Sequence, residues 1–221
     1  MSRLKVFLSF ASEDKVTAGQ YKVHLEKYYG FQVFVAHEDN VPSCDWDPEI
    51  EENISSSDIF TVLISEKSKT SPFVNQEIGM AIGKGLRIFP IKIDNTDPFG
   101  FIYKIHGFPY IRNPEEAVLK NGSKLFSILT SGRREFKAFG NIAIESAIYA
   151  LSKSPNFSDT NIIIKTLIET EAQHDFNKLH LNQIKAACLS NYEIYGGAFA
   201  YPQLHKLLTS KYNVKGLRDP S

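Results

Sequence analysis

The sequence predicts a doubly wound α/β domain with a five-stranded parallel sheet, followed by a small region made only of helices. Over the first 130 residues, short runs rich in β-branched and aromatic residues alternate with longer segments that carry apolar residues at helical spacing. This alternation is typical of β-α-β units, which build a parallel sheet. After residue 130 only the helical spacing remains. We therefore expect a domain at 1–130 and a helical region at 131–221.

The expected strands are short, as buried parallel strands are. Four clear runs lie at 5–10, 31–35, 59–64 and 87–93, and a shorter fifth strand is expected at 107–111. The helices of the first domain are expected at 16–28, 48–56, 72–83 and 114–130. Two of them begin at a proline that follows a capping residue, Asp47-Pro48 and Ser71-Pro72, and proline costs nothing at the first helical position.

The second region carries four helical patterns, at 141–151, 160–173, 177–189 and 202–212. These patterns are amphipathic, and we find no cluster of polar residues among them that could carry chemistry. We therefore expect the region to serve in regulation or assembly.

Composition excludes several classes of function. Lys plus Arg and Asp plus Glu are both 25, so no net charge attracts nucleic acid or an anionic membrane. The longest apolar runs are far below the ~20 residues that span a bilayer, and the N-terminus resembles a first strand rather than a signal peptide. Cys44 and Cys188 have no metal-ligand partners nearby, nor do the six histidines, which suggests free thiols and no metal. We expect a cytoplasmic protein that binds neither membranes nor nucleic acid.

The loop after the first strand separates this sequence from other doubly wound families. With the flavodoxin-like strand order 2-1-3-4-5, ligands bind at the loops after the first and third strands, where the order reverses. The first loop reads Ser-Phe-Ala-Ser-Glu-Asp at 9–14. It lacks the glycines of a dinucleotide or phosphate loop, the Thr-rich loop of flavodoxins, and the paired acidic residues of response-regulator receivers.

The segment 6–15, Val-Phe-Leu-Ser-Phe-Ala-Ser-Glu-Asp-Lys, resembles the opening of a TIR (Toll/interleukin-1 receptor) domain. The resemblance continues in register through a second strand, a BB loop at 37–47 and a third strand, and it covers residues 4 to 130. Ser65, Ser68 and Ser71 then resemble the serine-rich loop of the family, followed by its aromatic position and its helical glutamate, Phe73 and Glu77.

Three positions depart from the family pattern. Phe34 and Phe73 stand where tryptophan is frequent, and Asp45-Trp46-Asp47-Pro48 replaces a Gly-Asp pair in the BB loop. The first two changes keep an aromatic ring. The third leaves the contacts of that loop open.

The resemblance to prokaryotic TIR enzymes of anti-phage defence implies an NAD+ glycohydrolase or cyclase. Such an enzyme releases nicotinamide and either ADP-ribose or a cyclic isomer, which can act as a messenger to a separate effector. NAD+ is then the substrate, and no further cofactor is implied. Glu77 matches the catalytic glutamate, whose carboxylate would stabilise the positive charge that develops on the ribose.

The resemblance and the position of the loops also suggest residues that contact the substrate. Phe73 lies four residues before Glu77 and so on the same helical face. Phe10 could stack on a base, while Ser9 or the backbone near Ala11 could bind ribose or phosphate. The full set of expected substrate-binding residues is Ser9, Phe10, Ala11, Phe34, His37, Trp46, Ser65, Ser68 and Phe73.

These residues also allow other interpretations. A glutamate in a helix is most often a solvated residue, and Phe10, Phe34 and Phe73 could be ordinary core aromatics. Trp46 could contact a partner chain instead of a substrate. The whole domain could be a non-enzymatic module that self-associates through TIR–TIR contacts of its BB loop and helices.

Overall fold

A computed structural model describes residues 1–35 and 48–220. The chain forms two compact units that alternate along the sequence. We call Lys5–Leu25 with Gln32–Lys124 the sheet unit. We call Met1–Leu4, Glu26–Phe31 and Leu125–Ser221 the helical unit. The division into domains at residue 130 stays a prediction from the sequence.

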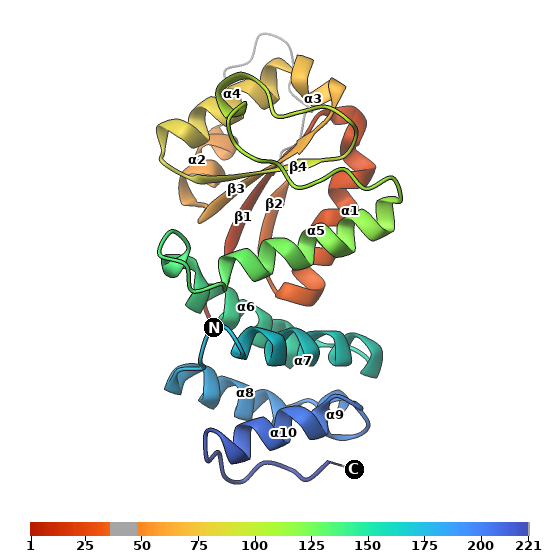
Figure 1. Ribbon diagram of the computed structural model, residues 1–221, viewed down its shortest axis with the longest axis vertical. Coiled ribbons are helices and arrows are strands. Elements are labelled where there is room, and N and C mark those ends of the chain that lie inside the picture. Colours follow the sequence, from red (N-terminus) through yellow and green to blue (C-terminus); the bar gives the residue numbers. More distant parts are fainter. Residues whose placement is uncertain (36–47, 221) are drawn as a thin grey trace. The chain divides into compact units, whose positions relative to one another are not determined.

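The sheet unit is built on four parallel strands (Figure 1), β1 (Lys5–Ser9), β2 (Gln32–Val35), β3 (Ile59–Ile64) and β4 (Arg87–Lys92). Their order is β2-β1-β3-β4, so the order reverses between β1 and β3. Every residue of β3 is buried, as expected for a central strand covered on both faces. The predicted parallel α/β architecture is therefore confirmed.

The prediction of a fifth strand at 107–111 is wrong: among the described residues the sheet has four strands. At 107–111 only Phe108 pairs, through a single bridge to Ile91. The Phe108 N–H donates to the Pro90 carbonyl at 2.8 Å, and the Lys92 N–H donates to the Phe108 carbonyl at 3.2 Å. In this register, pairing of the residues before Phe108 would need an N–H from residue 90 as a donor. Proline has no N–H, so the pairing with β4 does not extend from Phe108 toward residue 106.

Helices α2 (Pro48–Ser56) and α4 (Pro72–Gly83) lie on one side of the sheet, and α1 (Lys15–Tyr29) and α5 (Pro114–Leu129) lie on the other (Figure 1). Both α2 and α4 begin at the predicted prolines. The segment interpreted as a serine-rich loop contains a short helix, α3 (Glu66–Thr70). Two 3-10 turns, η1 (Ser12–Asp14) and η2 (Gly100–Ile102), complete the unit.

The core on the α4 side of the sheet is aromatic in the middle and aliphatic at its rim. The ring of Phe7 stacks on Phe60 at 5.4 Å between centroids and is tilted against Phe34 at 5.3 Å. Val74 and Ile78 of α4 pack into the same cluster. Burying each such side chain contributes about 2 kcal/mol, so this face holds α4 firmly on the sheet.

The helical unit contains α6 (Lys137–Lys153), α7 (Phe157–Glu171), α8 (Lys178–Ser190), α9 (Tyr192–Tyr195) and α10 (Tyr201–Ser210). Four of them lie where the sequence places helices, and α9 is an addition. Asparagine side chains cap three of these helices, at positions 156, 177 and 191.

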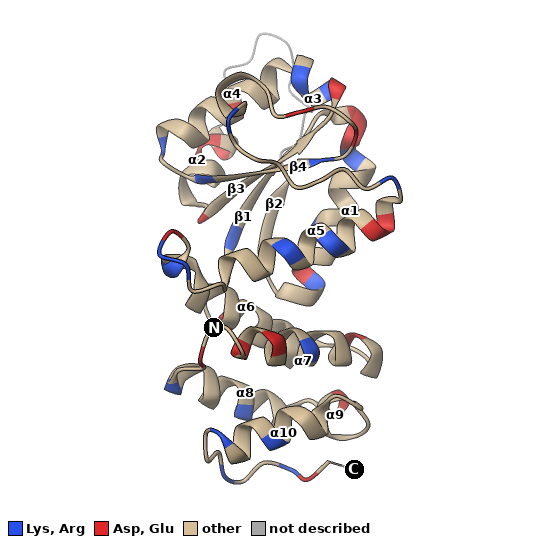
Figure 2. Cartoon of the chain, in the orientation of Figure 1, with Lys and Arg blue, Asp and Glu red and all other residues tan. Residues whose placement is uncertain are grey.

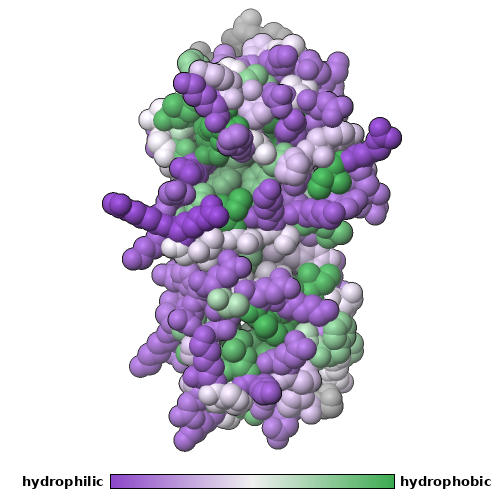
Figure 3. Space-filling view, viewed as in Figure 1, coloured by the Kyte–Doolittle hydropathy of each residue, from purple (hydrophilic) through white to green (hydrophobic). Residues whose placement is uncertain are grey.

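Basic and acidic residues are interspersed in both units (Figure 2), and hydrophobic side chains form several patches on the visible face (Figure 3). Among the helices that the structure describes, none is long and apolar enough to cross a membrane.

Candidate functional site

Glu77 is the most unusual residue of α4. The buried residues of this helix are Val74, Glu77, Ile78 and Ala81, so one carboxylate lies on a stripe that is otherwise apolar. Glu77 is 3% exposed. Burying a carboxylate is costly unless hydrogen bonds compensate, so its contacts decide what this residue can do.

Ser9 supplies one of these contacts. It is the last residue of β1 and is fully buried. Its hydroxyl donates to Oε2 of Glu77 at 2.5 Å, a length found for hydroxyl–carboxylate hydrogen bonds. The structure therefore brings together two of the predicted site residues, at the point where the strand order reverses.

The rest of the first loop packs inward. Phe10 and Ala11 are both buried, and the Ala11 carbonyl accepts a hydrogen bond from the backbone of Asp14, which closes η1. The carboxylate of Asp14 accepts a hydrogen bond from the Ser65 hydroxyl at 2.6 Å. This bond links the loop after β1 to the loop after β3. Asp14 is part of the sequence motif, but nothing in the sequence indicated its partner.

Ser65 and Ser68 form the capping box of α3. The Ser65 hydroxyl accepts from the Ser68 N–H at 3.0 Å, and the Ser68 hydroxyl accepts from the Ser65 N–H at 2.8 Å. Ser68 also donates to the Ser65 carbonyl. Both hydroxyls thus make bonds within the protein, and their predicted contact with substrate stays a prediction.

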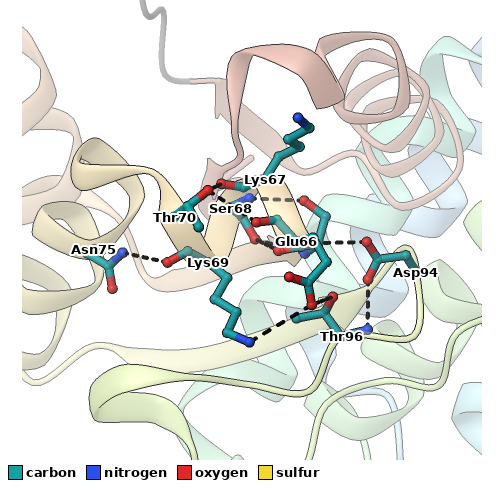
Figure 4. Close-up of polar contacts among 9 residues, drawn as sticks. Glu66, Lys67, Ser68, Lys69, Thr70, Asn75, Asp94 and Thr96 are labelled. Atoms are coloured by element: carbon teal, nitrogen blue, oxygen red, sulfur yellow. Dashed lines mark hydrogen bonds and ion pairs between the residues drawn. The ribbon is translucent and has the colours of Figure 1, made fainter.

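A second cluster of polar side chains lies in the segments that follow β3 and β4 (Figure 4). The Thr96 hydroxyl donates to the Glu66 carboxylate at 3.0 Å, and the Asp94 carboxylate accepts from the backbone N–H groups of Glu66 and Thr96. Burial disfavours the charged form of Asp94, but these hydrogen bonds outweigh it and lower its pKa. The group stabilises the turn that follows β4.

The remaining predicted residues lie apart from this cluster or outside the described chain. Phe34 lies on the edge strand β2, and its ring packs against that of Phe7. Phe73 lies one turn before Glu77 on α4 and is 39% exposed. His37 and Trp46 fall in 36–47, outside the described residues.

No group of three or more metal-binding side chains lies together in 1–35 and 48–220. Cys188 is a buried thiol, and desolvation raises its pKa to about 12.

Comparison with known families decides the identity of this fold. The family model described as "TIR domain" matches residues 6–120, more than half of the chain. The chain belongs to the TIR domain family. TIR domains act in signalling, and the family includes members that cleave NAD+.

A comparison with curated proteins gave no match. Among solved structures, the TIR domain of the Toll-related Receptor TRR-2 from Hydra magnipapillata is 20% identical to this chain. The match covers 56% of this chain and 95% of that chain, with a TM-score of 0.44.

In this TIR domain, the hydrogen bond between Ser9 and Glu77 joins β1 to α4 at the carboxyl edge of the sheet. The bond between Asp14 and Ser65 joins η1 to α3 at the same edge. These two bonds place one buried and one partly exposed carboxylate at the edge where doubly wound folds bind their ligands.

Proposed function

We propose that this TIR domain cleaves the bond between nicotinamide and ribose in NAD+, with Glu77 as the catalytic carboxylate. The observation that supports the proposal most is the place of Glu77. It is a buried carboxylate on an otherwise apolar stripe, next to the end of β1 where the strand order reverses. An apolar residue at this position would avoid the cost of burying a charge.

The chemistry needs one well-placed negative charge. As the bond between the ribosyl carbon and nicotinamide breaks, its electron pair goes to the nicotinamide nitrogen, which leaves as a neutral base. Positive charge then develops on the ribosyl ring, and a carboxylate in a low-dielectric site stabilises it. Attack on that carbon by water gives ADP-ribose and a proton, whereas attack by another nucleophilic group of the same ADP-ribosyl chain gives a cyclic isomer and a proton.

The site must open for this reaction. Glu77 is 3% exposed, so the ribose reaches its carboxylate only after the side chains that cover it have moved. We propose that self-association of the domain accompanies this opening. We also propose that the reaction takes place in the cytoplasm and that a cyclic product acts as a messenger to a separate effector in antiviral defence.

Glu77→Gln tests the proposal, because it keeps the size of the side chain and its ability to accept from Ser9 but removes the charge. Loss of electrostatic stabilisation should lower nicotinamide release roughly 100-fold or more. The thermal unfolding transition should shift little. The matched control is Glu52→Gln, the same change on the exposed surface of α2, which should leave release unaltered. Equal rates for wild type and Glu77→Gln would remove Glu77 from the mechanism.

A second candidate function is a non-enzymatic interaction module. Two observations favour it. Glu77 is buried and hydrogen-bonded, and the sheet unit exposes large aromatic residues near η2, with Phe101 81% and Tyr103 64% exposed. Exposed aromatic groups favour protein contacts. If the wild type self-associates but releases no nicotinamide under any condition of assembly, this function replaces the enzymatic one.

A further inference from the structure

The hydrogen bond between Ser9 and Glu77 suggests a role for Ser9 that differs from contact with substrate. We propose that Ser9 is a positioning residue, whose hydroxyl holds the Glu77 carboxylate in the orientation that faces the developing charge on the ribose. This inference rests on the proposed NAD+ cleavage. Ser9 then acts by holding another side chain of the protein and not by contacting the substrate.

Ser9 is well suited to hold another group because it cannot move far itself. It ends β1, which pairs with β2 on one side and with β3 on the other, and its partner in β3 is Val62. Its side chain lies on the same face of the sheet as that of Phe7, two residues earlier. The ring of Phe7 packs between the rings of Phe34 and Phe60. The Ser9 hydroxyl therefore starts from a rigid point.

The side chain of Glu77 can adopt more conformations than that of Ser9. A glutamate side chain has three rotatable bonds, and on the buried stripe of α4 its intrahelical neighbours Val74, Ile78 and Ala81 offer only apolar side chains. A hydrogen bond of 2.5 Å from a rigid strand selects one of the orientations that these bonds allow.

The loop around Ser9 is held by a second contact that does not involve Glu77. The Ser65 hydroxyl donates to Asp14, which fixes η1 against the N-terminus of α3. α3 is followed directly by α4, with Ser71 as the cap that joins them. Both partners of the Ser9–Glu77 bond are thus fixed in the backbone, and the side-chain bond contributes directly to the orientation of the carboxylate.

Ser9→Ala tests the role because it removes only the hydroxyl. If Ser9 positions the carboxylate, kcat for nicotinamide release should fall roughly 10- to 100-fold, the loss expected when a catalytic group is displaced by about 1 Å. KM for NAD+ should change by less than about two-fold, because the variant removes no contact with the bound ground state. A substrate-binding role would instead raise KM and would overturn the inference.

The matched control is Thr61→Val. Thr61 is a fully buried hydroxyl on the neighbouring strand β3, and it donates to the Phe7 carbonyl at 3.1 Å. Its loss removes a buried hydrogen bond of the same sheet without touching Glu77, so kcat should stay close to that of the wild type. Equal losses for Ser9→Ala and Thr61→Val would show that Ser9 acts only through the stability of the sheet.

Two further variants complete the test. Ser9→Thr keeps the hydroxyl and should restore most of the lost kcat, while adding Ser9→Ala to Glu77→Gln should lower the residual rate by less than about two-fold, because the carboxylate to be positioned is gone. Additive losses would contradict the inference. Unchanged kcat in Ser9→Ala, with an active wild type, overturns the role of Ser9 alone. An inactive wild type overturns the proposed function and this inference with it.

Discussion

Gly30 occupies a position in the helical unit that a larger residue does not fit. Its φ is +65°, in the region that favours glycine, and a Cβ there would lie 1.9 Å from the carbonyl oxygen of Ser146. Arg3 donates to the carbonyls of Gly30 and Phe31 and so fixes the same turn from the other side. The backbone of α6 can approach this turn closely only because position 30 has no side chain.

Gly30→Ala should therefore be strongly destabilising. The unfavourable φ and the steric conflict with Ser146 together should lower the free energy of unfolding by about 3 kcal/mol or more. Gly85→Ala separates the two causes, because Gly85 also has a positive φ, +71°, but within residues 1–35 and 48–220 no atom outside its chain neighbours lies within 4 Å of its Cβ position. That control should lose only about 1 kcal/mol. Equal losses in denaturant unfolding would show that the contact with Ser146 matters little.

At the scale of elements, the N-terminus of α8 depends on a neutral histidine. Asn177 caps the helix by accepting from the His180 N–H at 2.9 Å, and Nδ1 of His180 accepts from the Asn177 N–H in return. The burial of His180 disfavours the imidazolium and lowers its pKa. Glu145 acts in the opposite direction, and His174 acts in the same direction as burial.

This arrangement predicts loss of stability in mild acid. In the unfolded chain the histidine takes up a proton near its ordinary pKa of about 6.5, whereas in the folded chain it does so only at lower pH. The contribution of His180 is therefore fully present above about pH 6.5 and is lost as the pH falls toward the folded pKa. His180→Gln keeps a capping side chain without the titration and should flatten the decrease. Parallel curves of unfolding free energy against pH for both proteins would contradict the prediction.

At the scale of the whole molecule, the two compact units are not consecutive in sequence. The helical unit takes up the first four residues and the stretch Glu26–Phe31 as well as everything after Leu125. Within it, the ring of Phe126 stacks on Tyr29 at 4.9 Å and lies 6.1 Å from Phe31. The N–H of Leu4 donates to the Ser146 hydroxyl at 2.8 Å.

Because the two units alternate along the sequence, we expect a chain that ends at residue 130 to be less stable than the full chain, even though it keeps all four strands. The truncation removes α6, and with it the partner of Leu4 and the surface that covers Gly30. A loss of about 2 to 3 kcal/mol should lower the melting temperature by roughly 10 °C. The measurement is thermal unfolding of 1–130 beside the full chain. A truncated chain that melts like the full protein would show that residues 1–130 fold as an independent domain.

The local elements and the candidates for the site follow from the sequence alone. Apolar periodicity and capping signals depend on neighbouring residues, so they indicate β1, β3, α2 and α4 within one or two residues of their ends. The motif register likewise selected Ser9 and Glu77. α3 was missed because its five residues are too short to show a periodic pattern.

The way in which these elements meet depends on tertiary packing. Ser9 and Glu77 are 68 residues apart, and Asp14 and Ser65 are 51 apart, so no local pattern encodes their hydrogen bonds. The fifth strand fails for the same reason, because the direction in which Pro90 points is set by the pairing of β4 with β3. Local signals fix which backbone a segment adopts. The contacts that bury a charge or end a sheet depend on which distant segments pack together.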